Sequence, residues 1–309
     1  MKFKKPKFWD LKKPNFYSYI LLPITFLIQL VIYFKKKTTI NDFKIKTICV
    51  GNIYLGGTGK TSLCIKINEI LKEKNINSCF IKKFYRNQLD EQKILSQKSK
   101  VFSSKFRTDS IKQAEHQNYD VAIIDDGLQD KSINYDKSIV CFNNINWIGN
   151  GMVIPSGPLR ENLLNIKNYD CIFLNGNLEN LETIKKEILK IHSKANIYVG
   201  QYKILNINEI NLKNNYLAFS GIGNHKTFVS TLKKNKINLV GDLEFPDHYK
   251  YTSKDLDKII VHSKKINCKV ITTEKDYLRI ESQIKKEIQF VKSELIIINE
   301  EKFIKEIIF

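Results

Sequence analysis

The sequence predicts an α/β protein built on a parallel sheet, and three observations support this class. Short apolar runs alternate with helical or loop stretches, which is the pattern of strands joined by crossover helices. A glycine-rich turn separates one run from an amphipathic stretch, and a later run ends in two aspartates. The runs that read as buried strands are 47–50, 79–81, 121–124, 139–142, 171–174 and 197–199.

Length and composition narrow the class of protein. The chain has 309 residues, 42% of them hydrophobic, which suits about two domains of roughly 150 residues each and excludes general disorder. Only one long uncharged apolar run is present, so a polytopic membrane protein is excluded. None of the six cysteines forms a C-x-x-C pair, so we expect reduced thiols in a cytosolic compartment.

The net charge of +19 is unevenly distributed. The 51 basic residues divide into 47 lysines and four arginines, which indicates a compositional bias toward lysine as the general soluble residue. Residues 1–46 carry 11 lysines against two aspartates, a surplus of +9. A nucleic-acid surface or an anionic membrane surface is the alternative explanation for such charge.

That surplus flanks an uncharged apolar run, 16–34, which is near the length needed to cross a bilayer. Pro23 and Gln29 interrupt the run, and lysines flank both ends, whereas the positive-inside rule depletes one side of a spanning helix. We therefore expect a shallow or re-entrant helix with both ends on the cytoplasmic face, held by anionic lipid. A buried core helix is the alternative, and aromatic residues at both ends argue against it.

A phosphate-binding loop is predicted directly after the strand 47–50. Residues 51–61 read GNIYLGGTGKT, and apolar residues at helical spacing follow. Glycines let backbone N–H groups close around a phosphate, and the helix N-terminus adds its dipole. Lys60 would reach the β- and γ-phosphates of a nucleotide, and the Thr61 hydroxyl would ligate Mg²⁺. The strict pattern has glycine where Tyr54 stands, and the two adjacent glycines can supply the flexibility instead.

An acidic pair ends the run 121–124. Four apolar residues followed by Asp125 and Asp126 form a buried strand that delivers carboxylates to the carboxyl edge of the sheet, where ligands bind in open parallel sheets. Either carboxylate would hold Mg²⁺ directly or through water. The sequence therefore predicts a site for a nucleotide and Mg²⁺.

Seven segments, taken in order, resemble the tetraacyldisaccharide 4′-kinase family of lipid A biosynthesis. The resemblance runs along most of the chain, and seven segments in family order are highly specific. They are PKFW (6–9), VGN (50–52) leading to GGTGKT, DDGLQ (125–129), PSGPLRE (155–161), FSGIGN (219–224), FPDH (245–248) and TTEKD (272–276).

The resemblance implies a lipid kinase with ATP and Mg²⁺ as cofactors. The family transfers the γ-phosphate of ATP to the 4′-hydroxyl of a tetraacylated glucosamine disaccharide 1-phosphate, giving lipid IV-A, at the cytoplasmic face of the inner membrane. Its fold is a P-loop NTPase-like α/β/α domain and a smaller α/β domain, joined by a two-stranded linker. The implied partners are this glycolipid and an anionic membrane surface, with peripheral or N-terminally anchored attachment; no nucleic acid or protein partner is implied.

The family's motifs also assign roles to individual residues. Its catalytic Asp, in a D-E-P motif, matches Asp90, with Gln92 in place of proline; Asp90 would act as base with His248 from the other domain. The family's S-R-G-Y-G segment appears as KKFYR, without the glycines. The implied catalytic residues are Asp90, His248 and Lys60, and the implied metal ligands are Thr61, Asp125, Asp126 and Glu91. The implied nucleotide contacts are Tyr54, Leu55, Gly56, Gly57, Thr58, Gly59, Lys60, Thr61 and Gln129. The implied substrate or phosphate contacts are Arg160, Glu161, Arg107, Lys83 and Tyr85.

The scarcity of arginine independently supports a phosphate contact for two of these residues. Guanidinium binds phosphate in a bidentate manner, whereas ammonium acts as a point charge. Arg160 lies in PSGPLRE, and Arg107 precedes the acidic strand. We therefore expect Arg160, and also Arg107, to contact a nucleotide or substrate phosphate.

The domain organisation and two other function classes complete the expectations. We predict a basic, membrane-associated helix region at 1–46, a P-loop kinase domain at 47–204, and a smaller α/β domain with its linker at 205–309. A P-loop switch or partitioning ATPase is the second class, but such proteins often carry a signature lysine before the two glycines, where this chain has NIYL. A basic nucleic-acid binder is the third, and the chain has no known module and few arginines for base readout.

Overall fold

The computed structural model describes residues 5–34, 43–84, 89–281 and 283–308, and the chain divides into two compact units. The first unit comprises Met1–Gly200 and Ile297–Phe309, and the second comprises Gln201–Ile296. The predicted boundary after residue 204 lies close to this division, but the last helix, α10 (Glu300–Ile307), belongs to the first unit. The rings of Phe173 and Tyr198 pack against Phe303 of α10, which ties this helix to the first unit.

An eight-stranded sheet with the order β12-β7-β6-β5-β1-β4-β2-β3 forms the centre of the first unit. Neighbouring strands from β7 to β3 pair in parallel, which confirms the predicted α/β class with a mainly parallel sheet. The chain passes between the units in β7 and again in β12. The strands are β1 (Lys46–Gly51), β2 (Ser78–Lys83), β3 (Val101–Ser104), β4 (Val121–Asp125), β5 (Lys137–Asn143), β6 (Cys171–Asn175), β7 (Asn196–Ile204) and β12 (Ser293–Ile298).

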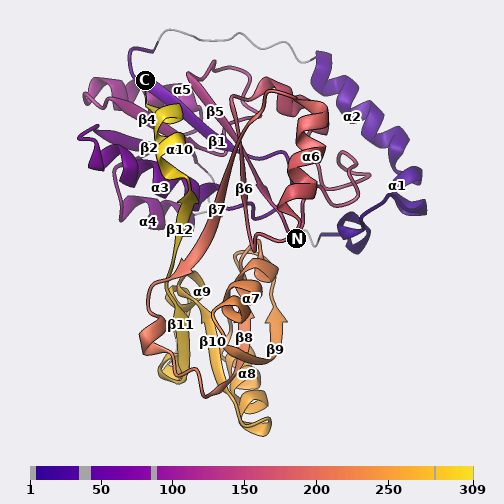
Figure 1. Cartoon of the computed structure of the whole chain (residues 1–309), viewed down its shortest axis with the longest axis vertical. Coiled ribbons are helices and arrows are strands. Elements are labelled where there is room, and N and C mark those ends of the chain that lie inside the picture. The colour runs from indigo at the N-terminus through magenta and orange to yellow at the C-terminus, as the bar shows by residue number, and fades with distance from the viewer. Residues whose placement is uncertain (1–4, 35–42, 85–88, 282, 309) are drawn as a thin grey trace. The chain divides into compact units, whose positions relative to one another are not determined.

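Helices cover both faces of this sheet (Figure 1). The apolar side chains of α5 and α6 join one cluster, which includes Cys49 and Ile124 of the central strands. On the other helical layer, Lys66 of α3 forms an ion pair of 2.7 Å with Glu300 of α10. Because both faces are covered, the central strands read as continuous apolar runs rather than alternating ones. The helices are α3 (Lys60–Glu73), α4 (Leu89–Ser96), α5 (Arg107–His116), α6 (Leu181–Ile191) and α10, with a short 3₁₀ helix at Leu163–Asn168.

The expected single helix over 16–34 is two helices, α1 (Phe16–Ile20) and α2 (Leu22–Phe34), which follow a 3₁₀ turn at Lys7–Asp10. The Asn15 side chain accepts a hydrogen bond from the Ser18 N–H and caps α1. Pro23 lies in the first turn of α2, where its missing N–H has no helical acceptor to lose. None of the helices in the described segments has both the length and the apolar content needed to cross a bilayer.

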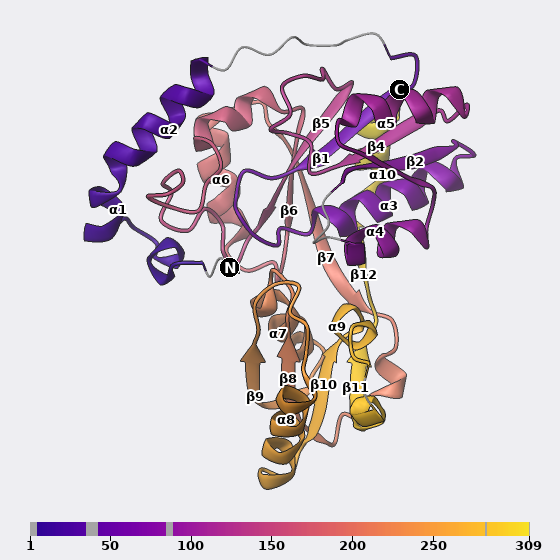
Figure 2. The ribbon, with the colours of Figure 1, turned by 180° about the vertical axis from the view of Figure 1, so that it is seen from behind.

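The second unit has its own four-stranded parallel sheet, with the order β11-β10-β8-β9 (Figure 2). Alternate residues of β8 face two different apolar clusters, one with α7 and the other with α8, so a helix covers each face. The strands are β8 (Asn215–Ser220), β9 (Asn238–Glu244), β10 (Lys269–Thr273) and β11 (Ile288–Val291). The helices are α7 (His225–Lys234), α8 (Ser253–Lys265) and α9 (Glu274–Leu278), with 3₁₀ turns at Ile207–Glu209 and Gln283–Glu287.

Candidate active site

The predicted phosphate-binding loop lies between β1 and α3. Gly59 has φ of 79°, in the left-handed region that favours glycine, and α3 begins at the next residue, Lys60. Inside the loop, the Nδ2 group of Asn52 donates to the Gly56 carbonyl (3.1 Å) and to the Thr58 hydroxyl (2.9 Å). Because Asn52 is fully buried, these bonds brace the loop from within.

The PSGPLRE segment packs against this loop through backbone hydrogen bonds. The Leu55 N–H donates to the Pro158 carbonyl (2.8 Å), and the Arg160 N–H donates to the Ile53 carbonyl (2.7 Å). Tyr54 is buried, and its hydroxyl donates to Asp10 (3.2 Å). Burial, together with the Asp10 charge, raises the pKa of Tyr54 far above its usual range, so the phenol stays protonated. The Tyr54 side chain is thus engaged in packing, and only its backbone belongs to the loop.

Asp125, the last residue of β4, is held by two side chains. The Lys82 ammonium lies 2.6 Å from its Oδ2 atom, and the Thr61 hydroxyl donates to the same atom (3.3 Å). The side chains of Lys82 and Asp125 are only 4% and 1% exposed, so this ion pair is buried. The first helical turn of α3 therefore lies beside the carboxyl end of β4, as the sequence predicts.

Asp126 gathers two further cations. The Arg160 guanidinium donates to both carboxylate oxygens (2.8 and 3.2 Å), and the Lys60 ammonium lies 3.7 Å from Oδ1. Burial raises the pKa of the Asp126 carboxyl, but Lys60 and Arg160 more than offset this effect, so the pKa lies below its usual value. Asp126 therefore stays ionised and holds together the lysine of the loop and the arginine of PSGPLRE.

Gln129 links three parts of the site. Its Nε2 group donates to the Asn52 carbonyl and to Glu161 (both 2.9 Å), and its Oε1 atom accepts from Arg160 (3.0 Å). Glu161 also accepts from the Tyr169 hydroxyl (2.7 Å). The structure thus gives Gln129 and Glu161 bracing roles around Arg160, and the predicted nucleotide contact of Gln129 and substrate contact of Glu161 stay predictions.

Arg107 stabilises the backbone at the acidic pair. Its guanidinium donates to the Asp126 carbonyl (2.6 Å) and to the Asp130 carboxylate (3.0 Å), and its side chain is 8% exposed. Asp126 has φ of 61°, and Arg107 bonds to the backbone at this left-handed residue. The visible role of Arg107 is to fix the turn after β4, and its predicted phosphate contact stays a prediction.

The acidic pair suits a magnesium ion that shares its ligands with a nucleotide. The Oδ1 atom of Asp125 is buried and has no hydrogen-bond partner among the described residues. Such an atom beside the Thr61 hydroxyl is a fitting oxygen ligand for a hard cation or its water. Among the described residues, no group of three or more His, Cys, Asp and Glu side chains could hold a metal ion by itself. Most ligands would therefore come from phosphate oxygens and water.

The remaining predicted residues of the first unit lie at the end of β2 and the start of α4. Lys83 ends β2, and the backbone of Asp90 and Glu91 forms the first turn of α4. Tyr85 lies outside the described residues, as do the side chains of Asp90 and Glu91. The roles predicted for these residues therefore stay predictions.

In the second unit, His248 sits in a network that gives the TTEKD segment a role. Its N–H donates to the Gly221 carbonyl (3.1 Å), and its Nδ1 atom lies 3.2 Å from the Arg279 guanidinium. Arg279 in turn bonds to the Gly221 carbonyl (2.9 Å) and to fully buried Asp276 (3.3 Å). Asp276 also accepts from the Gly221 N–H (3.1 Å), and its own N–H donates to the side chain of Thr273, the N-cap of α9. TTEKD thus anchors the arginine that contacts His248.

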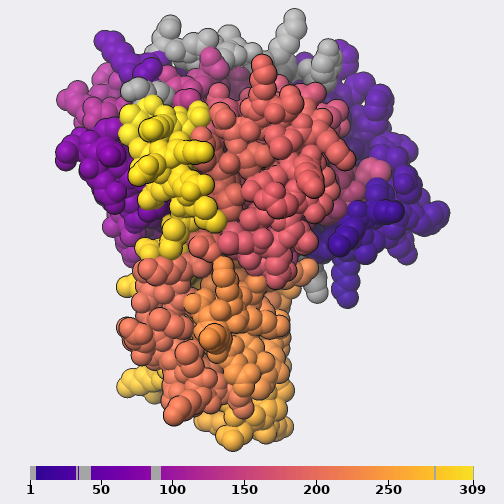
Figure 3. Space-filling view, in the orientation of Figure 1, coloured from indigo at the N-terminus to yellow at the C-terminus, as the bar shows by residue number. Residues whose placement is uncertain are grey.

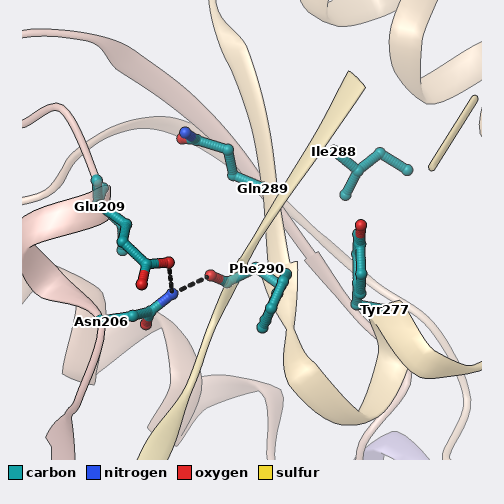
Figure 4. Close-up of a pocket in the computed structure, with 7 residues that line it drawn as sticks. Asn206, Glu209, Tyr277, Ile288, Gln289 and Phe290 are labelled. Atoms are coloured by element: carbon teal, nitrogen blue, oxygen red, sulfur yellow. Dashed lines mark hydrogen bonds between the residues drawn. The ribbon is translucent and has the colours of Figure 1, made fainter. Parts of the chain in front are cut away.

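A small pocket in the second unit is lined by residues that lie outside the recognised motifs (Figure 4). It has a volume of about 160 Å³. Its Asn206 side chain already donates to the Phe290 carbonyl (3.0 Å) and to Glu209 (3.4 Å). The pocket is lined by Asn206, Glu209, Ile210, Tyr277, Ile288, Gln289 and Phe290. Since none of these residues belongs to a recognised motif, we do not assign the pocket to catalysis.

Three site residues were missed by sequence reasoning. Lys82 reaches Asp125, Asn52 braces the loop, and the Nδ2 group of Asn175 donates to the Thr58 carbonyl. Asn52 and Lys82 stand at the carboxyl ends of apolar strands beside recognised motifs, which is a usable signal. Asn175 ends β6, and only the strand order brings it to the loop.

The class of the protein follows from the position of this loop. Because β1 and β4 are adjacent in the sheet, the loop with its Lys60-Thr61 pair and the two aspartates meet at one edge, and the first unit is a P-loop nucleotide-binding domain. The model of the family described as tetraacyldisaccharide-1-P 4′-kinase matches residues 17–308, and the chain belongs to this kinase family.

Two related sequences and one crystal structure agree with the assignment of the chain to this kinase family. The tetraacyldisaccharide 4′-kinase of Pelagibacter ubique is 57% identical over 308 residues, covering 100% of this chain and 98% of the relative. The tetraacyldisaccharide 4′-kinase of Rickettsia typhi is 34% identical over 292 residues, covering 89% and 88%. A crystal structure of LpxK from Aquifex aeolicus in complex with ATP aligns with a TM-score of 0.68 at 20% identity, covering 94% of this chain and 98% of that one, and shows the same fold.

Proposed function

We propose that this chain transfers the γ-phosphate of ATP to the 4′-hydroxyl of tetraacyldisaccharide 1-phosphate and forms lipid IV-A. The proposed reaction is the one by which the kinase family of this chain is described. The observation that carries the site assignment is the meeting of Lys60 and Arg160 on one carboxylate, Asp126, directly beside the phosphate-binding loop. Two cations held this way can move onto phosphate oxygens when ATP enters.

Lys60 and Arg160 have different parts in this scheme. Lys60, at the N-terminus of α3, would contact the β- and γ-phosphates together with the backbone N–H groups of the loop. The planar guanidinium of Arg160 binds oxygens in pairs, as its two bonds to Asp126 show, and would neutralise charge on the transferred group. Asp126 and Gln129 hold Arg160 in place before the nucleotide arrives.

Magnesium would be held by Thr61 and the acidic pair. It would neutralise the phosphate oxygens and keep the γ-phosphate in line with the acceptor. We assign Asp125 and Asp126 as its protein carboxylates, acting directly or through water, and Glu91 as a further candidate.

The acceptor hydroxyl needs a base. As the bond from the 4′-oxygen to the γ-phosphorus forms, the bond to the β–γ bridging oxygen breaks, ADP leaves, and the hydroxyl proton passes to a carboxylate. We assign Asp90 as this base and His248 as its partner, and Lys83 and Tyr85 as substrate contacts. Since Asp90 belongs to the first unit and His248 to the second, catalysis would require the two units to close.

The N-terminal helices are proposed to attach the enzyme to an anionic membrane surface at the cytoplasmic face of the inner membrane. Their polar side chains face the protein: Ser18 accepts from Asn150 (2.9 Å), and the Thr25 and Ser156 hydroxyls are 2.8 Å apart. Their apolar side chains face outward; Phe26 and Val31 are each 67% exposed. Figure 3 shows these helices, in indigo, on the surface of the first unit. An exposed apolar face of this kind suits a glycolipid substrate.

The decisive experiment supplies purified protein in detergent with ATP, Mg²⁺ and tetraacyldisaccharide 1-phosphate and follows 4′-phosphorylated product. We expect transfer by the wild-type protein and a loss of at least ~100-fold with Lys60→Ala. Lys66→Ala is the matched control. It removes another lysine of α3, which pairs with Glu300, and should retain activity. ATP hydrolysis without transfer to the lipid would instead favour a membrane ATPase.

A further inference from the structure

A lysine buried beside the acidic pair is a charge that the proposed reaction does not use. Lys82 and Asp125 are direct neighbours across the β2–β4 ladder. Their side chains meet at 2.6 Å and are almost completely removed from solvent. An ion pair this deeply buried is retained at the cost of desolvating both charges, so its partners depend strongly on each other.

The lysine makes the two oxygens of Asp125 unequal. Oδ2 is taken by the Lys82 ammonium and the Thr61 hydroxyl, whereas Oδ1 is buried without a hydrogen-bond partner among the described residues. The carboxylate is thereby held in one orientation, with one oxygen engaged and the other available. An available oxygen beside Thr61 is where a cation or its water would bind.

Protein cations also balance the whole acidic pair. Asp125 faces Lys82, and Asp126 faces Lys60 and Arg160. A divalent cation that approaches these carboxylates alone therefore meets three positive groups nearby. The Lys82 ammonium cannot leave easily, because the strand holds it in a buried position, whereas Lys60 and Arg160 are more exposed.

We propose that Lys82 is a positioning residue that keeps the affinity of the site for free Mg²⁺ low, so that Mg²⁺ binds together with the nucleotide. The lysine holds the Asp125 carboxylate in one orientation, and it lets the carboxylate reach the ion through Oδ1 alone. The phosphates of the nucleotide then add the negative charge that the site lacks. This inference rests on the proposed nucleotide site but not on the identity of the acceptor.

The test measures Mg²⁺ binding without nucleotide or lipid, from the thermal unfolding midpoint at rising MgCl₂. We expect wild-type protein to respond weakly. Lys82→Met should unfold at a lower temperature without Mg²⁺, regain stability as Mg²⁺ is added, and bind the ion at least ~10-fold more tightly. Lys137→Met is the matched control: it removes a strand lysine that pairs with Glu306 and should not change the Mg²⁺ response. Equal Mg²⁺ affinities for wild type and Lys82→Met would overturn the proposal.

Two further variants keep the test decisive if Lys82→Met does not fold. Lys82→Met combined with Asp125→Asn removes both buried charges and should fold without responding to Mg²⁺. Asp125→Asn alone leaves Lys82 buried without a carboxylate and should be less stable than the double variant. If Asp125→Asn and the double variant are equally stable, the Lys82–Asp125 pair is not coupled and the proposal fails. Because no lipid is present, a failed kinase assay would leave these results unaffected.

Discussion

The guanidinium of Arg279 lies 3.2 Å from Nδ1 of His248. A guanidinium can only donate hydrogen bonds, so the Nδ1 atom must accept and the imidazole must carry its proton on Nε2. Asp276, which is fully buried, and the Gly221 carbonyl hold Arg279 in this position. The second unit thus presents His248 as an Nε2–H donor, which suits a residue that orients a carboxylate base rather than one that takes the proton.

The first prediction follows from this contact. Arg279→Met should remove the donor to Nδ1, mix the two tautomers of His248 and lower kcat by ~10-fold while KM for ATP stays unchanged. Nitrogen-15 NMR of the histidine ring reports the tautomer directly. Arg279→Lys restores a donor and should recover part of the rate. An unchanged tautomer in Arg279→Met would show that the contact does not set the proton position.

The second prediction concerns the assigned base. Asp90→Asn and His248→Ala should each lower turnover by ~10²–10⁴-fold, because proton transfer from the 4′-hydroxyl loses its acceptor or the group that orients it. ATP binding, measured separately, should be retained in both. Asp109→Asn, at an exposed aspartate in α5, is the control and should be fully active. A near-normal rate for either test variant would reassign the base.

The third prediction uses the lowered pKa of Asp126. Since the folded-state pKa lies below the usual 3.8, the ionised carboxylate contributes stability that is present above that pH and is lost as the pH falls through the folded-state pKa. Arg160→Met removes the bidentate partner and should raise the pKa of Asp126. The wild type should therefore be more stable than Arg160→Met near neutral pH, and the difference should shrink as the pH falls below 3.8 and through the folded-state pKa of Asp126.

Thermal unfolding midpoints of both proteins across this range check that prediction, and a pH-independent difference would contradict it. Arg160→Lys separates charge from geometry. Lysine keeps the positive charge but cannot bind both Asp126 oxygens in the same plane, so it should retain part of the stability and lose phosphoryl transfer by ~10-fold or more. Unchanged kinetics for Arg160→Lys would remove Arg160 from the phosphate site.

The fourth prediction concerns the outward face of α2. Replacing Phe26 and Val31 by serine should weaken binding to anionic lipid vesicles by at least ~10-fold, because both side chains are 67% exposed in the protein and would lose apolar contact with lipid. The unfolding temperature should not change. Val261→Ser, at a valine of α8 that is 53% exposed, is the control. Equal vesicle binding by the double variant and the wild type would place the membrane contact elsewhere.

Several features could be predicted from the sequence because they depend on neighbours in the chain. The strand 47–50, the turn with Gly59 and the helix from Lys60 follow from apolar runs, glycine and helical spacing, and the structure confirms the parallel α/β class. The split of 16–34 at Leu21 was not predicted. Pro23 lies directly after the break and disfavours a continuous helix there, and Ser18 and Thr25 on either side bond to Asn150 and Ser156, far along the chain.

By itself, the sequence determined the family, the phosphate-binding loop and the acidic pair, since each is a local pattern of residues with its own chemistry. Only the tertiary structure decided which side chains meet. Lys82 with Asp125, Arg160 with Asp126, and α10 with the first unit depend on the order of strands in the sheet. The period of apolar residues along a strand reports which residues are buried, but it does not report which strand lies beside which.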